Sequence, residues 1–307
     1  MDNKTVICIL GATATGKSGL SLSLANRING EVISADSMQI YRGLDIGTAK
    51  ISKSQMQGIT HHMLDIVAPT DNFSVAQYCT MAQACIEDIF DRCKVPMLVG
   101  GTGLYIDSLL SGLEFAEMTV DESYREQLHD LAAKQGNETV WKQLNEVDPA
   151  LAQTLHPNNL RRVIRALEVY HVCGQPMSEM ARIAQREPKY SCIYIGLRYA
   201  DRQLLYKRIN ERVDHMLEQG LLSEIERVLN AGVPRDCQAL QAIGYKEFLP
   251  YFDGMISLDE AVETAKRNSR RYAKRQYTWF KRNEQIHWID VDLENSLERA
   301  EKILGLI

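Results

Sequence analysis

The sequence predicts an α/β fold, with helices on the faces of a parallel sheet and an inserted all-helical domain. Two observations predict it. Short apolar runs alternate with helical stretches over residues 1–112, and one further apolar run follows at Cys192–Leu197. Between them, from about Glu117 to Tyr190, the sequence has helical periodicity and no strand-like run. Such alternation is typical of parallel sheets covered by helices, and 307 residues suffice for one large domain or two modest ones.

The first elements are a strand at Val6–Leu10 and a helix over Leu20–Ala25, with a Gly-x-x-x-x-Gly-Lys-Ser loop between them. Its glycines let backbone N–H groups surround a polyphosphate, and the helix N-terminus adds partial positive charge. Lys17 supplies a mobile cation and Ser18 a hydroxyl for Mg²⁺. The core is therefore predicted to be P-loop NTPase-like, although the loop alone leaves the reaction open. The predicted diphosphate- or triphosphate-binding residues are Gly11, Ala12, Thr13, Ala14, Thr15, Gly16, Lys17 and Ser18.

Two more predicted strands end in loops suited to a ligand. Glu31–Ala35 is a short strand followed by Asp36, and Val95–Val99 is a buried strand followed by a Gly-Gly-Thr-Gly turn. A helix is expected over residues 73–92, capped by Ser74. Ligands of a parallel sheet gather at the carboxyl ends of its strands, so we expect the three loops to converge.

The remaining elements define the domain organisation. We expect the strand at Cys192–Leu197 to rejoin the sheet. The α/β core with C-terminal helices is assigned to residues 1–116 and 191–307, and the helical insertion to residues 117–190. Helices are predicted in the insertion at 123–135, 139–147, 149–155 and 159–172, and after the last strand at 201–219, 221–231 and 259 to about 282.

Asp36 and Thr102 are candidate catalytic residues. A carboxylate such as Asp36, just beyond the second strand, can ligate magnesium or act as a general base. It can equally cap a helix. Thr102 lies in the Gly-Gly-Thr-Gly turn, where the backbone can approach a ligand closely. The alternative is a tight strand-to-helix turn with no ligand.

Arg208 and Arg212 are candidates for binding a leaving pyrophosphate. Their i, i+4 spacing presents both guanidinium groups on one helix face, and arginine binds such anions in a bidentate manner. The alternative is a solvated face on which the arginines pair with Glu211 and Glu218.

Two clusters of basic residues contrast with the negative net charge of the chain, which is −5. The first contains Arg161, Arg162 and Arg165. The second spans residues 266–282, holds eight basic side chains with aromatic residues interleaved, and has no acid between Thr264 and Asn283. A one-sided basic helix is typical of phosphate-backbone binding, although such faces are also commonly only solvent-facing. Two of the aromatic residues are expected in the core, Trp279 and Phe280.

The histidines and cysteines predict no metal site. Adjacent side chains such as His61 and His62 point apart in any regular element, so we expect structural hydrogen bonds rather than a metal site with Asp65. The seven cysteines form no C-x-x-C pair, and we expect reduced, mostly buried thiols. No apolar run approaches the ~20 residues of a membrane span, and no signal or transit segment is recognised, so a cytoplasmic protein is expected.

Several motifs, taken together and in order, resemble one family. The chain is similar to bacterial tRNA dimethylallyltransferases, also called tRNA isopentenyltransferases. The motifs are residues 11–18, 33–41, 45–50, 61–65, 98–105, 159–162, 244–245 and 274–280.

The resemblance implies transfer of a dimethylallyl group from dimethylallyl pyrophosphate to N6 of the adenosine 3′-adjacent to the anticodon, position 37 of the tRNA. Thr13–Ser18 would bind the pyrophosphate, with Mg²⁺ on Ser18. Asp36 would act as base, Thr102 would lie beside the adenine, and Arg212 would bind the leaving group. The family uses its nucleotide-binding loop for the prenyl donor rather than for ATP. Ala12 stands where the family most often has proline.

The expected tRNA contacts are Asp36, Ser37, Met38, Gln39, Thr102, Arg125, Asn159, Leu160, Arg161, Arg162 and Val163, with Arg270, Arg271 and Lys274 from the second basic cluster. We expect a monomer with no obligate protein partner and no membrane attachment.

Three alternatives stay open at this level. An adenylate isopentenyltransferase would act on free AMP and would need neither the insertion nor the basic helix. A small-molecule P-loop kinase would transfer phosphate from ATP. A non-catalytic RNA-binding protein would carry a vestigial loop.

Overall fold

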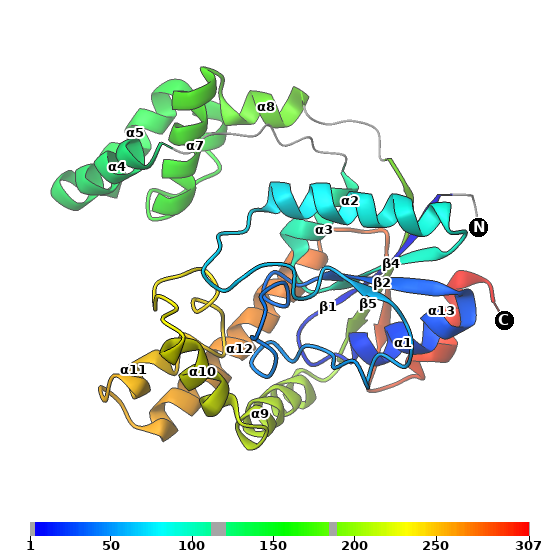
Figure 1. Cartoon of the computed structure of the whole chain (residues 1–307). Helices are drawn as coiled ribbons and strands as arrows, with labels where there is room; N and C mark the ends of the chain where they lie inside the picture. The colour runs from blue at the N-terminus through cyan, green and yellow to red at the C-terminus, as the bar shows by residue number, and fades with distance from the viewer. Residues whose placement is uncertain (1–3, 112–120, 184–188, 307) are drawn as a thin grey trace. The chain divides into compact units, whose positions relative to one another are not determined.

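The structure is a computed structural model that describes residues 4–111, 121–183 and 189–306. It comprises two compact units, described separately below (Figure 1). The first consists of Met1–Leu109 and Tyr190–Ile307, and the second of Leu110–Lys189.

A six-stranded sheet with the order β3-β2-β4-β1-β5-β6 forms the centre of the first unit, and every pairing in it is parallel. The predicted parallel α/β core is therefore confirmed. The strand after the insertion rejoins the sheet as expected, with Thr5 opposite Ser191 and Gly11 opposite Leu197. The strands are β1 (Thr5–Gly11), β2 (Gly30–Ala35), β3 (His61–His62), β4 (Val95–Gly100), β5 (Ser191–Arg198) and β6 (Ile286–Asp290).

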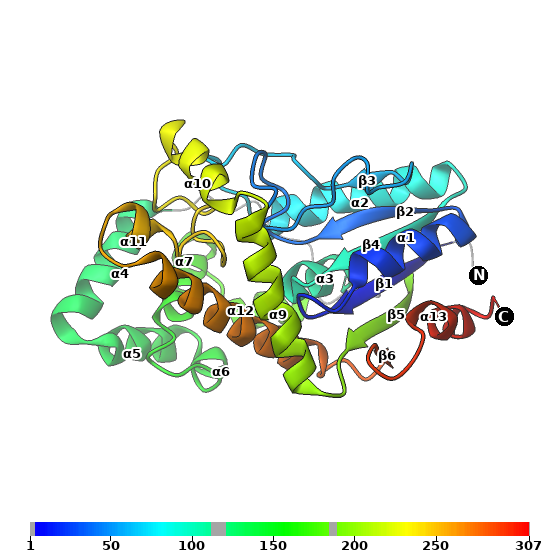
Figure 2. The same ribbon diagram turned by 90° about the horizontal axis from the view of Figure 1, so that it is seen from below.

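Helices pack on both faces of this sheet (Figures 1 and 2). On one face, Leu24 of α1 and Leu304 of α13 join Ile7, Met97 and Ile195 of the strands in a single apolar cluster. Helix α2 packs on β2 and β4. The helices of the first unit are α1 (Lys17–Ile28), α2 (Val75–Asp91), α3 (Gly103–Leu110), α9 (Arg202–Glu218), α10 (Leu221–Asn230), α11 (Leu249–Phe252), α12 (Leu258–Phe280) and α13 (Ser296–Leu304).

Side-chain caps explain where the main helices begin. Ser74 caps α2 in a capping box with Gln77, which confirms the predicted cap. Ser257 does the same for α12 with Glu260, and Asp201 caps α9. Helices α9 and α12 pack against each other and lie beyond the carboxyl ends of the strands, where the predicted loops are found (Figure 2).

The second unit is helical and has its own core. Leu128, Val140, Leu144, Val163 and Leu167 are the buried apolar centre. Four of its helices were predicted, although α6 ends earlier than expected, and α8 was not predicted. The helices described in this unit are α4 (Glu122–Gln135), α5 (Asn137–Val147), α6 (Pro149–Ala152), α7 (Leu160–Cys173) and α8 (Met177–Ile183). Among the described helices of both units, none is both long and apolar enough to cross a bilayer.

Candidate active site

The loop between β1 and α1 has the backbone geometry that the motif predicts. Gly11 has φ 147°, and a Cβ there would lie 2.5 Å from the carbonyl oxygen of Leu197. Gly16 caps α1 with φ 86°, and Ala14 between them also has a positive φ of 64°. Glycine adopts such angles without steric cost. The chain therefore turns tightly around the N-terminus of α1, which is suited to anion binding.

Lys17 is folded back onto its own loop. Its Nζ donates to the carbonyl of Ala12 at 2.6 Å, and the Thr15 hydroxyl donates to the same carbonyl at 2.9 Å. Burial, helped by the cation of Arg212 and opposed by Asp36, lowers the pKa of Lys17 from its ordinary 10.5 to about 8. An anion in front of the loop would offset this loss of hydration.

A cavity of about 380 Å³, the phosphate cavity, opens in front of this loop. Lys17 and Ser18 line it on the loop side, and Asp36 and Arg212 are also among its lining residues. It continues into an apolar part lined by Val32, Ile51, Leu64 and Val99.

Asp36 and Thr102 come from neighbouring strands and are linked through Ser37. The Thr102 hydroxyl accepts a hydrogen bond from the Ser37 N–H at 3.0 Å, and the Thr102 N–H donates to the carbonyl of Ala35 at 3.0 Å. Asp36 accepts from the Met38 N–H at 2.9 Å and begins a turn. It caps no helix among the described elements, so that alternative does not apply.

Arg212 and Arg208 line different cavities, although both were candidates for binding a leaving pyrophosphate. Arg212 of α9 lines the phosphate cavity and donates through Nη2 to the carbonyl of Thr48 at 3.4 Å. Burial lowers the pKa of Arg212, and the charge of Asp36 opposes this shift. Arg208 is exposed and lies 4.0 Å from Glu211. It lines a separate cavity of about 490 Å³, which Ala14 and Thr15 of the loop also line.

The inner face of α12 adds two residues to the site. Gln276 is buried; its Oε1 accepts from the Thr13 N–H at 2.9 Å, and its Nε2 donates to the carbonyl of Gly101 at 3.0 Å. Tyr272 lies one turn earlier, and burial together with the charge of Asp36 raises its pKa to about 12. Gln276 was not among the predicted site residues: its i, i+4 spacing places it on one helix face with Tyr272, but no local pattern marks its contact with Thr13.

A second cavity of about 300 Å³ lies beside the phosphate cavity. The two share four lining residues, Thr13, Asp36, Arg212 and Tyr272. Its remaining walls are largely apolar, with Met38, Met216, Ile243 and Phe248 among them. The Asp36 carboxylate and the Arg212 guanidinium therefore lie where the phosphate cavity meets the more apolar second cavity.

The outer face of α12 carries only part of the predicted basic cluster. Arg271, Lys274 and Arg275 are exposed. In contrast, Arg270 donates to Asn210 Oδ1 at 2.6 Å, and Lys266 pairs with Asp214 at 2.7 Å.

The aromatic residues at the end of α12 differ in their burial. Phe280 is buried, as predicted. Trp279 is only half-buried, which corrects the expectation that it is a core residue. Its indole donates to Asp107 Oδ2 at 2.7 Å, and Arg282 lies 4.2 Å from its ring centre. The indole N–H needs a polar partner, which keeps this ring at the edge of the core.

The residues of the second unit that were predicted to contact tRNA also differ in their exposure. Arg161 and Arg162 are exposed in the first turn of α7, and Asn159 caps that helix without a side-chain bond. The Val163 side chain is fully buried, and Leu160 is packed against the same core. Arg125 pairs with the buried Glu168 and with Glu122.

The adjacent histidines have the hydrogen-bonding roles that were predicted. His61 Nδ1 lies 2.9 Å from the carbonyl of Ile59, and His62 Nε2 lies 2.8 Å from Glu31. Hydrogen bonds from Arg92, Lys94 and His62 hold the pKa of Glu31 well below its usual range, although burial opposes them. No group of three or more potential metal-binding His, Cys, Asp or Glu residues occurs in the described ranges.

A glycine-rich phosphate loop at the carboxyl edge of a parallel sheet, with a carboxylate and an arginine lining the same cavity, is that of a P-loop α/β protein. Comparison with known proteins specifies the family. The family model for IPP transferase matches residues 39–283, and the chain belongs to this family, as the motifs had indicated.

The relatives cover nearly the whole chain. The tRNA dimethylallyltransferase of Geobacillus thermodenitrificans is 50% identical over 303 residues, which are 98% of this chain and 96% of that protein. Among solved structures, the tRNA isopentenylpyrophosphate transferase of Bacillus halodurans has 43% identity and a TM-score of 0.74, over 99% of this chain and 95% of that one. A eukaryotic dimethylallyltransferase acting on tRNA has 32% identity and a TM-score of 0.82, over 98% and 79%.

Proposed function

We propose that this chain transfers the dimethylallyl group of dimethylallyl pyrophosphate to N6 of the adenosine 3′-adjacent to the anticodon in tRNA and releases pyrophosphate. The observation that carries the proposal is the meeting of two cavities at Asp36 and Arg212. One is lined by a phosphate loop and the other by largely apolar side chains, which suits a reaction that joins an anionic donor to a planar base.

The phosphate cavity is the proposed donor site. Backbone N–H groups of the loop, with Lys17 and Arg212, would stabilise the charge that develops on pyrophosphate as the allylic C–O bond breaks. The apolar part around Val32, Ile51 and Leu64 suits the hydrocarbon tail.

The same cavity has side-chain oxygen ligands that fit Mg²⁺. Ser18 and Asp36 both line it, and hydroxyl and carboxylate oxygens are what this ion prefers. Ser18 would hold the ion, which when bound would neutralise part of the pyrophosphate charge.

The second cavity is the proposed site of the adenine. The exocyclic N6 is a weak nucleophile because its lone pair is delocalised into the ring. As N6 forms its bond to C1 of the allyl group, the C–O electron pair leaves with pyrophosphate, and Asp36 takes the N6 proton. The adenine must leave its stack to reach Asp36, which an unpaired anticodon loop permits at low cost.

The proposed tRNA contacts lie in both units. In the first, Arg271 and Lys274 project from the exposed face of α12, and in the second, Arg161 and Arg162 are exposed on α7. Basic side chains on helix surfaces are the usual partners of RNA phosphates.

We further propose that the protein is a monomer without an obligate protein partner, which sedimentation of the pure protein would check. The proposed location is the cytoplasm.

The test is incubation with labelled dimethylallyl pyrophosphate and either unmodified tRNA or AMP, and in parallel with labelled ATP. The expected result is label in tRNA at the adenosine next to the anticodon. Label in AMP alone would replace the tRNA substrate by a free nucleotide. Phosphate transfer from ATP would replace the prenyl reaction by a kinase reaction. Binding of tRNA without any transfer would reduce the protein to an RNA-binding module.

A further inference from the structure

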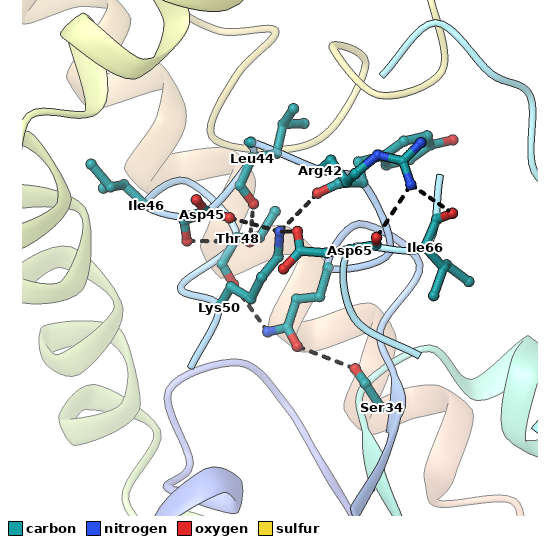
Figure 3. A network of polar contacts seen from close by, with 12 residues as sticks. Ser34, Arg42, Leu44, Asp45, Ile46, Thr48, Lys50, Asp65 and Ile66 are labelled. Carbon is teal, nitrogen blue, oxygen red and sulfur yellow. Dashed lines mark hydrogen bonds and ion pairs between the residues drawn. The ribbon is translucent and has the colours of Figure 1, made fainter. Parts of the chain in front are cut away.

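Lys50 is a buried cation that lies outside both cavities. Its side chain is 4% exposed, and its Nζ contacts Asp45 Oδ1 at 2.7 Å, Asp65 Oδ1 at 2.6 Å and the carbonyl of Tyr41 at 2.7 Å. Figure 3 shows these contacts converging on the ammonium group. The loop of residues 41–50, called here the Lys50 loop, is therefore closed on itself and tied to the neighbouring segment through Asp65.

A buried carboxylate holds the other side of the Lys50 loop. Glu224 of α10 accepts hydrogen bonds from the backbone N–H groups of Asp45 at 2.9 Å, Ile46 at 2.9 Å and Gly47 at 3.1 Å. It also accepts a hydrogen bond from the Tyr245 hydroxyl at 2.6 Å. A Cβ on Gly47 would lie 2.4 Å from the Tyr245 ring, so the loop is in direct contact with this support.

The Lys50 loop presents one carbonyl toward the site. The Thr48 carbonyl accepts from Arg212 Nη2 at 3.4 Å and from Gln39 Nε2 at 3.3 Å. The Thr48 side chain faces the other way and donates to the carbonyl of Leu44 at 2.7 Å (Figure 3). Both contacts to the Thr48 carbonyl are near the upper limit for hydrogen bonds, so a small displacement of the loop would break them.

We infer that Lys50 is a positioning residue that acts through Arg212. By closing the Lys50 loop, whose other side is held by Glu224, it keeps the Thr48 carbonyl where it orients the Arg212 guanidinium toward the pyrophosphate. The inference rests on the proposed function for the identity of the anion. Displacement of a catalytic group by about 1 Å can cost on the order of a hundredfold in rate, so a residue that touches no substrate can still control the reaction.

The experiment is a double-mutant cycle between Lys50→Met and Arg212→Ala. Prenyl transfer to tRNA and binding of inorganic pyrophosphate by calorimetry are both measured. In the parent background, Lys50→Met should lower kcat by roughly 10- to 100-fold and weaken pyrophosphate binding. In the Arg212→Ala background it should change either quantity by less than about 3-fold, because coupled residues are not additive. Lys50→Arg should restore part of the loss, since it keeps the cation.

The matched control is Lys53→Met, an exposed lysine three residues on, which should behave like the parent. If Lys50→Met lowers both quantities equally in the two backgrounds, the lysine serves the fold generally and the inference is overturned. An unchanged Lys50→Met variant overturns it as well. Should Lys50→Met fail to give a cooperative thermal transition, Asp65→Asn replaces it and should show a smaller effect with the same dependence on Arg212. Failure of the parent to modify tRNA would contradict the proposed function, whereas the pyrophosphate cycle would still decide the role of Lys50.

Discussion

The backbone N–H of Thr13 donates a hydrogen bond of 2.9 Å to the side chain of Gln276, which lies 263 residues further along the chain. The same amide side chain donates to the carbonyl of Gly101 at 3.0 Å. The contact is close, because a Cβ on Gly101 would lie 2.1 Å from the Gln276 nitrogen. Helix α12 thus fixes the phosphate loop and the turn that carries Thr102 in one arrangement.

Replacement of Gln276 by glutamate should therefore damage the donor site specifically. The new carboxylate would face the carbonyl of Gly101 and lie next to the incoming pyrophosphate, and like charges in a buried site repel strongly. We expect the KM for dimethylallyl pyrophosphate to rise at least about tenfold, because juxtaposed like charges oppose binding of the anionic donor. Steady-state kinetics at saturating tRNA measures it. Thr278→Ala, on the exposed side of the same helix, is the control, and an equal rise there would contradict the role of Gln276.

Replacement of Asp36 by asparagine should remove catalysis and leave RNA binding intact. The amide oxygen can still accept from the Met38 N–H, so the turn is retained, but the base is lost. General-base catalysis contributes about 10²- to 10⁴-fold, and kcat should fall by that factor while the Kd for tRNA stays within about twofold. Single-turnover transfer and filter binding measure the two quantities. Asp91→Asn, exposed at the end of α2, should match the parent. A comparable rate for Asp36→Asn would exclude Asp36 as the base.

Charge reversal at Arg271 and Lys274 should weaken tRNA binding in a salt-dependent way. Both side chains are exposed on α12, and each phosphate contact that is lost reduces the slope of log K against log salt by about 1. The tRNA affinity of Arg271→Glu and Lys274→Glu is to be measured between low and moderate salt. Lys302→Glu, on α13, provides the control. Parallel lines for mutant and parent would show that this face does not contact RNA.

Local sequence signals predicted the parts of the fold that depend on neighbouring residues. The phosphate loop follows from its glycines and flanking elements, and the α2 cap follows from Ser74. Strands β3 and β6 were not predicted, because His61–His62 is only two residues long and Ile286–Asp290 is a short run in which burial does not alternate regularly. Such strands are defined by pairing with β2 and β5 rather than by their own composition.

In the candidate site too, residues with a local sequence pattern were predicted, and residues whose role depends on distant contacts were not. Asp36, Thr102 and Arg212 were named from local patterns, and the structure brings Asp36 and Arg212 into one cavity. Gln276 could not be assigned, since its role depends on a contact with Thr13 far away in the sequence. Helical periodicity also failed to distinguish Arg208 from Arg212, because one helix face spans two cavities.

Donor binding should weaken as the pH rises through about 8. The pKa of Lys17 is lowered to about 8 by burial and by Arg212, so the free protein loses this cation above that pH. The linkage to stability has the opposite sign. Between pH 8 and 10.5 the unfolded chain binds more protons at this lysine than the folded chain, so stability rises with pH over this window and the buried charge is unfavourable below it.

Lys17→Met tests both consequences. At pH 7 the variant should melt at a higher temperature than the parent, because no ammonium is buried. Its pyrophosphate affinity should be lower by roughly a hundredfold or more, as for loss of one preorganised charge contact, and should no longer change between pH 7 and 9. Calorimetry and thermal unfolding across that range provide both readouts. A parent whose pyrophosphate affinity is constant over the same range would show that Lys17 stays charged there.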